Sequence, residues 1–94
     1  MTVSDGPWTA RLAVRLDPPR LADWLERALR PEASREVPRT RAEVLRTDEG
    51  AIEVAITARD VGALRAALNT YLGWIHLSLE TARTAAAPGT PPGP

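Results

Sequence analysis

The feature that most constrains the fold is a long helical pattern over residues 60–83 that is apolar on more than one side. At about 100° per residue, its large apolar residues fall on one broad stripe with the i, i+3, i+4, i+7 spacing of a core-facing helix. This stripe consists of Val61, Leu64, Leu68, Tyr71, Leu72, Ile75 and Leu79. We expect it to pack against the core of its own domain.

The opposite flank of the same helical pattern carries small and apolar residues where a surface helix would carry charges. These residues are Ala63, Ala66, Ala67, Thr70, Gly73, Trp74 and Leu77. Small residues let a second helix approach closely, so we predict a partner-binding surface here with Trp74 as its anchor. Its residues are Ala66, Thr70, Gly73, Trp74 and Leu77. Two alternatives stay open: an earlier helix of the same chain covers this flank, or that helix and a partner share it.

The residues before this helix predict two elements. Residues 8–16 alternate with period two and place Leu12 and Val14 on the apolar side, which predicts a half-buried strand. Residues 18–30 have the spacing of a helix with one apolar face. We expect Asp17 to cap this helix and Pro31 to end it.

The middle of the chain predicts a hairpin. Residues 39–47 form a weaker strand pattern, and residues 51–58 alternate clearly, with Ile52, Val54 and Ile56 on one face. The turn residues Asp48 to Gly50 join the two patterns, and Asp60 is placed to cap the long helix. The order is therefore β-α-β-β-α, and we predict an α+β fold in which both helices pack on one face of a three-stranded antiparallel sheet.

The chain of 94 residues is short, so we expect one small domain whose core is near the lower limit for independent folding. We predict a flexible N-terminus over residues 1–7, a single domain over residues 8–84, and a disordered tail over residues 85–94, which is rich in Pro, Gly and Ala. The sequence has no cysteine and no apolar run long enough to span a membrane, and it begins without a signal-peptide pattern. We therefore expect a cytoplasmic protein without membrane contact.

Residues for catalysis are scarce in this sequence. His76 is the only histidine and lies near Asn69 and Glu80 on the polar strip of the helix, but a base needs both a nucleophile and an orienting group within hydrogen-bond reach, and we expect no such set here. No cluster has the spacing of metal ligands, and the glycines are too isolated to form a phosphate-binding loop. We therefore predict a chain that is not an enzyme and has no metal or cofactor, although a site built across a dimer interface stays open.

Several arginines between the two helical patterns allow two interpretations. They are Arg35, Arg39, Arg41 and Arg46. Acidic residues interrupt the run and no aromatic residue stands between them, which favours a solvated loop and strand face. The functional interpretation is that these four residues contact phosphates within a larger complex and position RNA without reading its sequence.

Two stretches resemble a known family: ALRPE at residues 28–32 and, more specifically, DVGALRAALNTYLGWI at residues 60–75. Together with the β-α-β-β-α order, they resemble the small Pcc-type subunit of the KEOPS tRNA-modification complex, a family related to the CTAG/LAGE proteins. The most specific residues of this resemblance are Leu68, Asn69, Tyr71, Leu72, Trp74 and Ile75. Thr70 and Gly73 depart from the family pattern, which usually has Ser and a larger, often basic residue at these positions.

The resemblance implies a non-catalytic scaffold that forms a homodimer and docks the Kae-type threonylcarbamoyltransferase. That enzyme makes threonylcarbamoyladenosine in tRNA next to the anticodon. The resemblance also implies an indirect link to the KEOPS kinase subunit and contact with tRNA inside the complex. The competing interpretation is a stand-alone KH-like RNA-binding module, which the topology favours, although the chain lacks a GXXG clamp.

Overall fold

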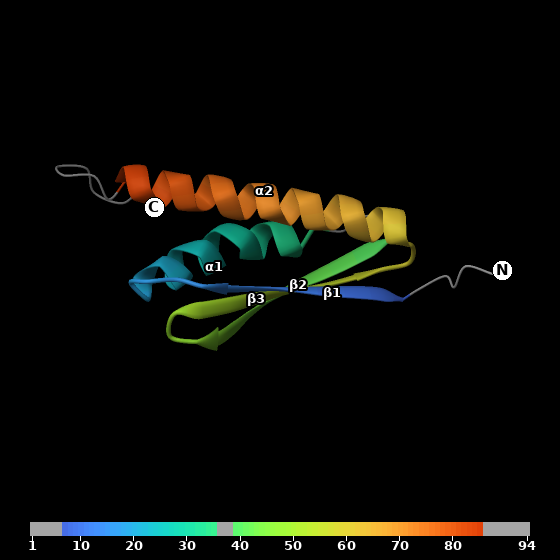
Figure 1. Cartoon of the computed structure of the whole chain (residues 1–94), viewed down its shortest axis with the longest axis horizontal. Coiled ribbons are helices and arrows are strands. Elements are labelled where there is room, and N and C mark those ends of the chain that lie inside the picture. Colours follow the sequence, from blue (N-terminus) through green and yellow to red (C-terminus); the bar gives the residue numbers. More distant parts are fainter. Residues whose placement is uncertain (1–6, 36–38, 86–94) are drawn as a thin grey trace.

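The computed structural model describes residues 7–35 and 39–85. Five elements follow one another in the order β1 (Trp8–Arg15), α1 (Arg20–Ala33), β2 (Thr40–Asp48), β3 (Ala51–Ala58) and α2 (Val61–Ala85). The strands form one antiparallel sheet in the order β1-β3-β2, and both helices cover the same face of it (Figure 1). The α+β fold predicted from the sequence is therefore confirmed.

The core lies between the sheet and the two helices, and the central strand β3 contributes most to it. Ile52, Val54 and Ile56 alternate along β3 with side chains that are completely or almost completely buried. The helices cover them with Leu25, Leu29, Leu64, Tyr71 and Ile75. The indole N–H of Trp24 in α1 donates a 3.2 Å hydrogen bond to the carbonyl of Ser78, which ties the two helices together.

The hairpin between β2 and β3 turns through Glu49 and Gly50. Asp48 Oδ1 accepts a 2.8 Å hydrogen bond from the Gly50 N–H, and the Leu16 N–H donates a 2.7 Å bond to the Gly50 carbonyl. A side chain at position 50 would bring its Cβ within 2.9 Å of the Leu16 carbonyl oxygen, so this close approach of two backbones requires glycine. The predicted hairpin is confirmed.

The ends of the helices differ in part from the sequence predictions. Asp60 caps α2 as predicted, because its Oδ1 accepts a 2.8 Å bond from the Ala63 N–H. The prediction for Asp17 is wrong: Pro19 is the N-cap of α1, and no side chain caps it. Pro31 also fails to end α1, which continues to Ala33. Because Pro31 stands in the last turn, it removes only one helical hydrogen bond, and the exposed position of Arg27 leaves the released carbonyl open to water.

The predictions for the chain ends concern residues 1–6 and 86–94, which lie outside the described residues, so they stay predictions. Pro7 immediately precedes β1, and Ala85 is the last residue of α2. Over residues 7–35 and 39–85, neither helix has the length and apolar character needed to cross a membrane.

Candidate interaction surface

The outer side of α2 carries a row of exposed residues without charge. Ala66, Thr70, Gly73 and Leu77 are separated by four, three and four positions, so they lie in one line along the helix. We call these four residues the α2 stripe. All four are exposed, and the Leu77 side chain is 63% exposed. The helix therefore shows its small, apolar flank to the outside of this chain.

Hydrogen bonds inside the helix make this surface less polar than its sequence indicates. The Thr70 hydroxyl donates a 2.9 Å bond to the Ala66 carbonyl, and the Thr81 hydroxyl donates an equally long bond to the Leu77 carbonyl. Both hydroxyls are thus satisfied one turn back in the same helix, which is a common arrangement for Thr in helices. The hydroxyl protons of Thr70 and Thr81 consequently need no acceptor from a partner.

Gly73 is the member of the α2 stripe that the fold of this chain does not explain. A Cβ at position 73 would have no neighbouring atom within 4 Å, so no close contact inside the chain excludes a larger residue. Glycine in the middle of a helix costs about 1 kcal/mol relative to alanine. A surface glycine with this cost and no internal reason is consistent with a partner that approaches the helix backbone.

Trp74 has a different position from the stripe. Its side chain is half-buried, packs against the core and meets the Tyr71 ring edge-to-face, with 5.0 Å between the ring centroids and an interplanar angle of 81°. Ala63 and Ala67 are also half-buried on this side of α2. The flank is therefore divided: α1 and the sheet cover Trp74 and its neighbours in part, whereas the α2 stripe stays exposed.

A small pocket of about 180 Å³ lies beside Trp74, between the end of α1, the start of β2 and α2. Tyr71 lines this pocket. Burial is the larger cause of a raised pKa of the Tyr71 phenol, and the negative charge of Glu32 is the smaller cause. A phenol with a raised pKa stays protonated at neutral pH and is a hydrogen-bond donor. Most of the other lining residues are alanines and apolar side chains, which suits an apolar group of a partner rather than a reaction.

Two residues of the predicted core stripe are exposed. Val61 is 56% exposed and Leu72 is 51% exposed. On the helical wheel, Val61 and Leu72 flank the core-facing residues on one side, and Ser78 flanks them on the other side. Ser78 contacts α1. The side of α2 that carries Val61 and Leu72 therefore faces away from α1, and the expectation that the whole stripe is core is wrong at both positions.

The edge strand β1 is also incompletely covered. Along β1 the residues that face the helices, such as Leu12 and Val14, are half-buried, whereas those of β3 are buried. β1 pairs with β3 along one edge only, and over the described residues no strand occupies its other edge. We call β1 together with the exposed side chains of Val61 and Leu72 the β1 rim.

The four arginines that the sequence analysis proposed for RNA do not form one patch. Arg46 is only 27% exposed in its side chain and lies near the turn of the hairpin. Its Nη1 lies 2.6 Å from Asp23 Oδ1 and 3.0 Å from Glu26 Oε1, both on α1, and its other nitrogens donate to the carbonyls of Asp48 and Glu49. The hydrogen bond to Asp23 is the largest cause of a raised pKa of Arg46, and the hydrogen bond to Glu26 is the second. These bonds join the hairpin to α1.

The other three arginines lie toward the opposite end of the sheet. Arg35 forms a 3.6 Å ion pair with Glu32, and Arg39 Nη1 forms a 2.9 Å ion pair with Asp60 Oδ2. Arg41 makes no ion pair with any residue that the structure describes. That these arginines contact tRNA stays a prediction.

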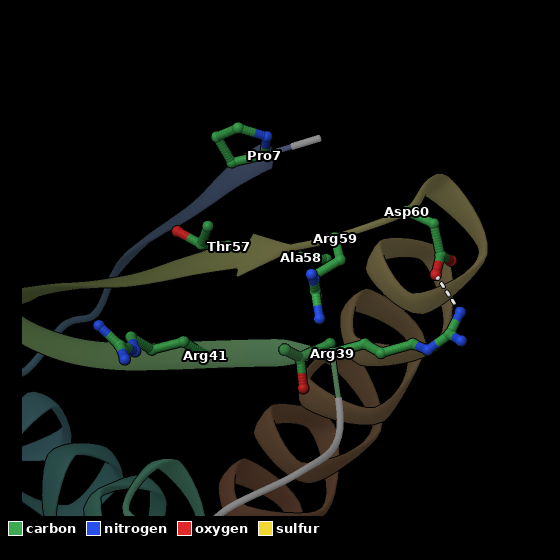
Figure 2. A pocket seen from close by; sticks show the side chains of 8 residues that line it. Pro7, Arg39, Arg41, Thr57, Ala58, Arg59 and Asp60 are labelled. Carbon is green, nitrogen blue, oxygen red and sulfur yellow. Dashed lines mark hydrogen bonds and ion pairs between the residues drawn. The ribbon is translucent and has the colours of Figure 1, made fainter. Parts of the chain in front are cut away.

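The sequence analysis missed Arg59, which follows β3 and joins Arg39 and Arg41 around a cleft at the end of the sheet (Figure 2). A signal was available, because Arg59 continues the period-two face of Ala55 and Thr57. His76 is exposed on α2, and the described residues contain no group of His, Cys, Asp or Glu that could hold a metal ion.

Comparison with known proteins identifies the family. The model of the family described as "Transcription factor Pcc1" matches residues 9–83. This range includes all of α1, β2 and β3 and nearly all of β1 and α2. A search of curated proteins found no match. The family match covers the α2 stripe, the β1 rim and the arginines together, and it agrees with the resemblance in residues 60–75. The chain therefore belongs to the Pcc1 family, the Pcc-type subunits of KEOPS complexes.

Proposed function

We propose that this chain is a non-catalytic scaffold subunit of a KEOPS complex. It dimerises and docks the Kae-type threonylcarbamoyltransferase, which modifies the adenosine next to the tRNA anticodon, and it connects to the kinase subunit only through that enzyme. Complex and substrate would meet in the cytoplasm. The observation that carries the proposal is the exposed, uncharged α2 stripe on a chain of the Pcc1 family.

The α2 stripe supports docking of a helix for a steric reason. Ala66 and Gly73 have little or no side chain, and the hydroxyl of Thr70 is bonded within the helix, so a second helix can lie close to the α2 backbone. Leu77 at one end offers an apolar side chain that a partner can bury. Burying the exposed 63% of Leu77 would contribute about 1–2 kcal/mol.

The β1 rim supports dimerisation. An unpaired edge strand is a template for pairing with a second chain, and the β1 rim adds partly exposed apolar side chains to that edge. The opposite edge, β2, is less suitable, because it contains a register irregularity between Arg46 and Asp48 and several charged side chains. We therefore assign the homodimer contact to the β1 rim and the transferase contact to the α2 stripe.

The experiment that tests these assignments compares one substitution at two leucines of the same helix. Leu77→Lys changes the α2 stripe, and Leu72→Lys changes the β1 rim, about 140° away around α2. Each variant is purified and its melting temperature is compared with that of the wild type. Its mass in solution is then measured by light scattering, and its affinity for the Kae-type transferase by calorimetry.

We expect Leu77→Lys to remain dimeric and to bind the transferase at least about tenfold more weakly, because a charge replaces a buried apolar contact. Leu72→Lys should shift the mass toward the monomer. Unchanged transferase affinity in a folded Leu77→Lys variant would contradict the docking assignment. Trp74→Glu is a poorer test, because Trp74 also packs against the core and its loss would weaken the fold itself.

A further inference from the structure

An arginine-lined cleft lies at the end of the sheet where β1 and β2 begin and β3 ends (Figure 2). It is open and has a volume of about 790 Å³. Its lining residues are Pro7, Arg39, Thr40, Arg41, Thr57, Ala58, Arg59 and Asp60. Among these described lining residues, three arginines and one aspartate carry a formal charge of +2, whereas the whole chain has a formal net charge of zero. The positive charge is therefore local.

The sheet register determines which of these groups face each other. Arg41 of β2 pairs with Thr57 of β3, and the next step of the ladder joins the Arg59 N–H to the Arg39 carbonyl by a 2.9 Å hydrogen bond. Arg41, Thr57 and Arg59 alternate with the inward-facing Ala58 and Ala42, so they belong to the face of the sheet that carries no helix. The strand ladder thus brings two guanidinium groups and one hydroxyl to the same end of the open face.

The negative charge in the cleft already has partners. Asp60 Oδ1 accepts the Ala63 N–H at the start of α2, and its Oδ2 accepts Arg39 Nη1 at 2.9 Å. These contacts lower the pKa of the Asp60 carboxyl, and the hydrogen bond from the Ala63 N–H is the larger cause. Asp60 therefore stays ionised and balances the charge of Arg39. Arg41 and Arg59 form no ion pair with any of residues 7–35 and 39–85. Their charges are the unbalanced ones.

The other two arginines on the open face of the sheet are balanced. Arg11 Nη1 lies 3.3 Å from Glu53 Oε1, an ion pair without hydrogen-bond geometry, and Arg15 Nη2 lies 2.7 Å from Asp48 Oδ2. The arginines of this face that have no ion pair with a described residue are therefore Arg41 and Arg59 at the end with the cleft, and the exposed Glu43 lies two positions along β2 from Arg41. An anion that reaches the open face meets its strongest attraction there.

We propose that this cleft binds a phosphate group of a nucleic-acid backbone, with Arg41 and Arg59 as the charged donors and Thr57 as a hydroxyl donor. Guanidinium groups suit phosphate because their planar N–H groups can donate two parallel hydrogen bonds. Among the lining residues that the structure describes there is no aromatic side chain to stack on bases, so we expect a contact that does not depend on sequence. An open cleft of this size admits a phosphate that belongs to a continuous strand. The proposal goes beyond the scaffold role, because it concerns the opposite face of the sheet and needs no partner protein.

The test uses the full chain and a short fluorescein-labelled single-stranded RNA. Arg41→Gln/Arg59→Gln removes the two unbalanced charges of the cleft. Arg20→Gln/Arg27→Gln removes two charges from exposed positions on α1, so it is a control with the same change in net charge. Melting curves establish that both variants are folded, and fluorescence anisotropy gives the dissociation constant at several salt concentrations. In parallel, inorganic phosphate is titrated into the wild type while backbone amide resonances are followed by NMR.

We expect the cleft variant to bind RNA at least about tenfold more weakly at low salt, and its salt slope to fall by about 0.7, since the cleft holds one phosphate and each phosphate contact on a single strand contributes about 0.7. The control variant should bind almost like the wild type. If both variants bind RNA alike but phosphate shifts the amides of Arg41 and Arg59, the phosphate site is supported and its ligand is a small phosphate. Equal RNA binding by both variants without amide shifts at these residues would overturn the proposal.

Discussion

Gly73→Ala is the substitution that most directly relates the stability of this fold to its proposed function. Gly73 lies inside α2, its position is exposed, and an added Cβ would meet no atom within 4 Å. The substitution therefore removes the backbone entropy cost of glycine without creating a clash. Host–guest measurements place this gain at about 0.8–1.0 kcal/mol in a helix interior.

The gain should be visible in a thermal unfolding experiment. For a domain of this size, about 1 kcal/mol corresponds to an increase of about 4–8 °C in the melting temperature. Circular dichroism at the helical wavelength measures it, and a urea titration with a higher midpoint and an unchanged m-value would show that stability rose without a change in the surface exposed on unfolding. Because the chain is proposed to dimerise, wild type and variant must be compared at the same protein concentration.

The same variant should bind the Kae-type transferase more weakly, because a methyl group then stands where a partner approaches the α2 backbone. Higher stability together with lower affinity would explain why a glycine occupies this position. If Gly73→Ala is no more stable than the wild type, the reasoning about α2 is refuted. If it is more stable and binds the transferase equally well, Gly73 lies outside the docking surface.

Two further predictions use the same unfolding assay. Gly50→Ala should destabilise the fold by about 1–3 kcal/mol, because its Cβ would lie 2.9 Å from the Leu16 carbonyl oxygen; a neutral effect would show that the two backbones can separate easily. Asp60 has a folded pKa below its ordinary value of 3.8, so its contribution to stability is present above about pH 4 and is lost as the pH falls through the lowered pKa. Asp60→Asn should therefore be less stable than the wild type at neutral pH, and the two stability curves should converge in acid; a constant difference down to low pH would contradict the charge-based explanation.

Most of the fold could be predicted from local sequence patterns. Period-two alternation identified β1 and β3, and helical spacing identified both helices within a few residues of their ends. The errors in the helix ends concern α1, where the local rules for proline and for the N-cap did not hold. Pro31 is tolerated because it stands in the last turn of α1, and Pro19 rather than Asp17 occupies the N-cap position.

The surfaces were harder to predict, because they depend on which elements become neighbours. A helical wheel shows that Val61 and Leu72 are apolar, but it cannot show that they lie beyond the cover of α1 and at the side of a sheet with only three strands. Similarly, the pairing of Arg46 with Asp23 and Glu26 joins residues more than a dozen positions apart, and local charge patterns do not contain that information. Sequence reasoning left open whether an earlier helix, a partner or both cover this flank of α2, and only the packing shows that Trp74 and its neighbours are partly covered while the α2 stripe is exposed.

The described residues keep their charged groups at the surface of the domain, and its interior is used for packing. Within the described residues, no charged side chain is buried, and the buried titratable group is the Tyr71 phenol, whose pKa burial raises. The surfaces proposed for binding point in different directions: the uncharged α2 stripe lies on the outer side of a helix, the β1 rim at a sheet edge, and the arginine cleft at the end of the open sheet face. A small domain that uses its interior only for packing has its whole surface available for contacts. Because these three surfaces do not overlap, a second copy, a transferase and a nucleic-acid strand could bind the same chain without competing.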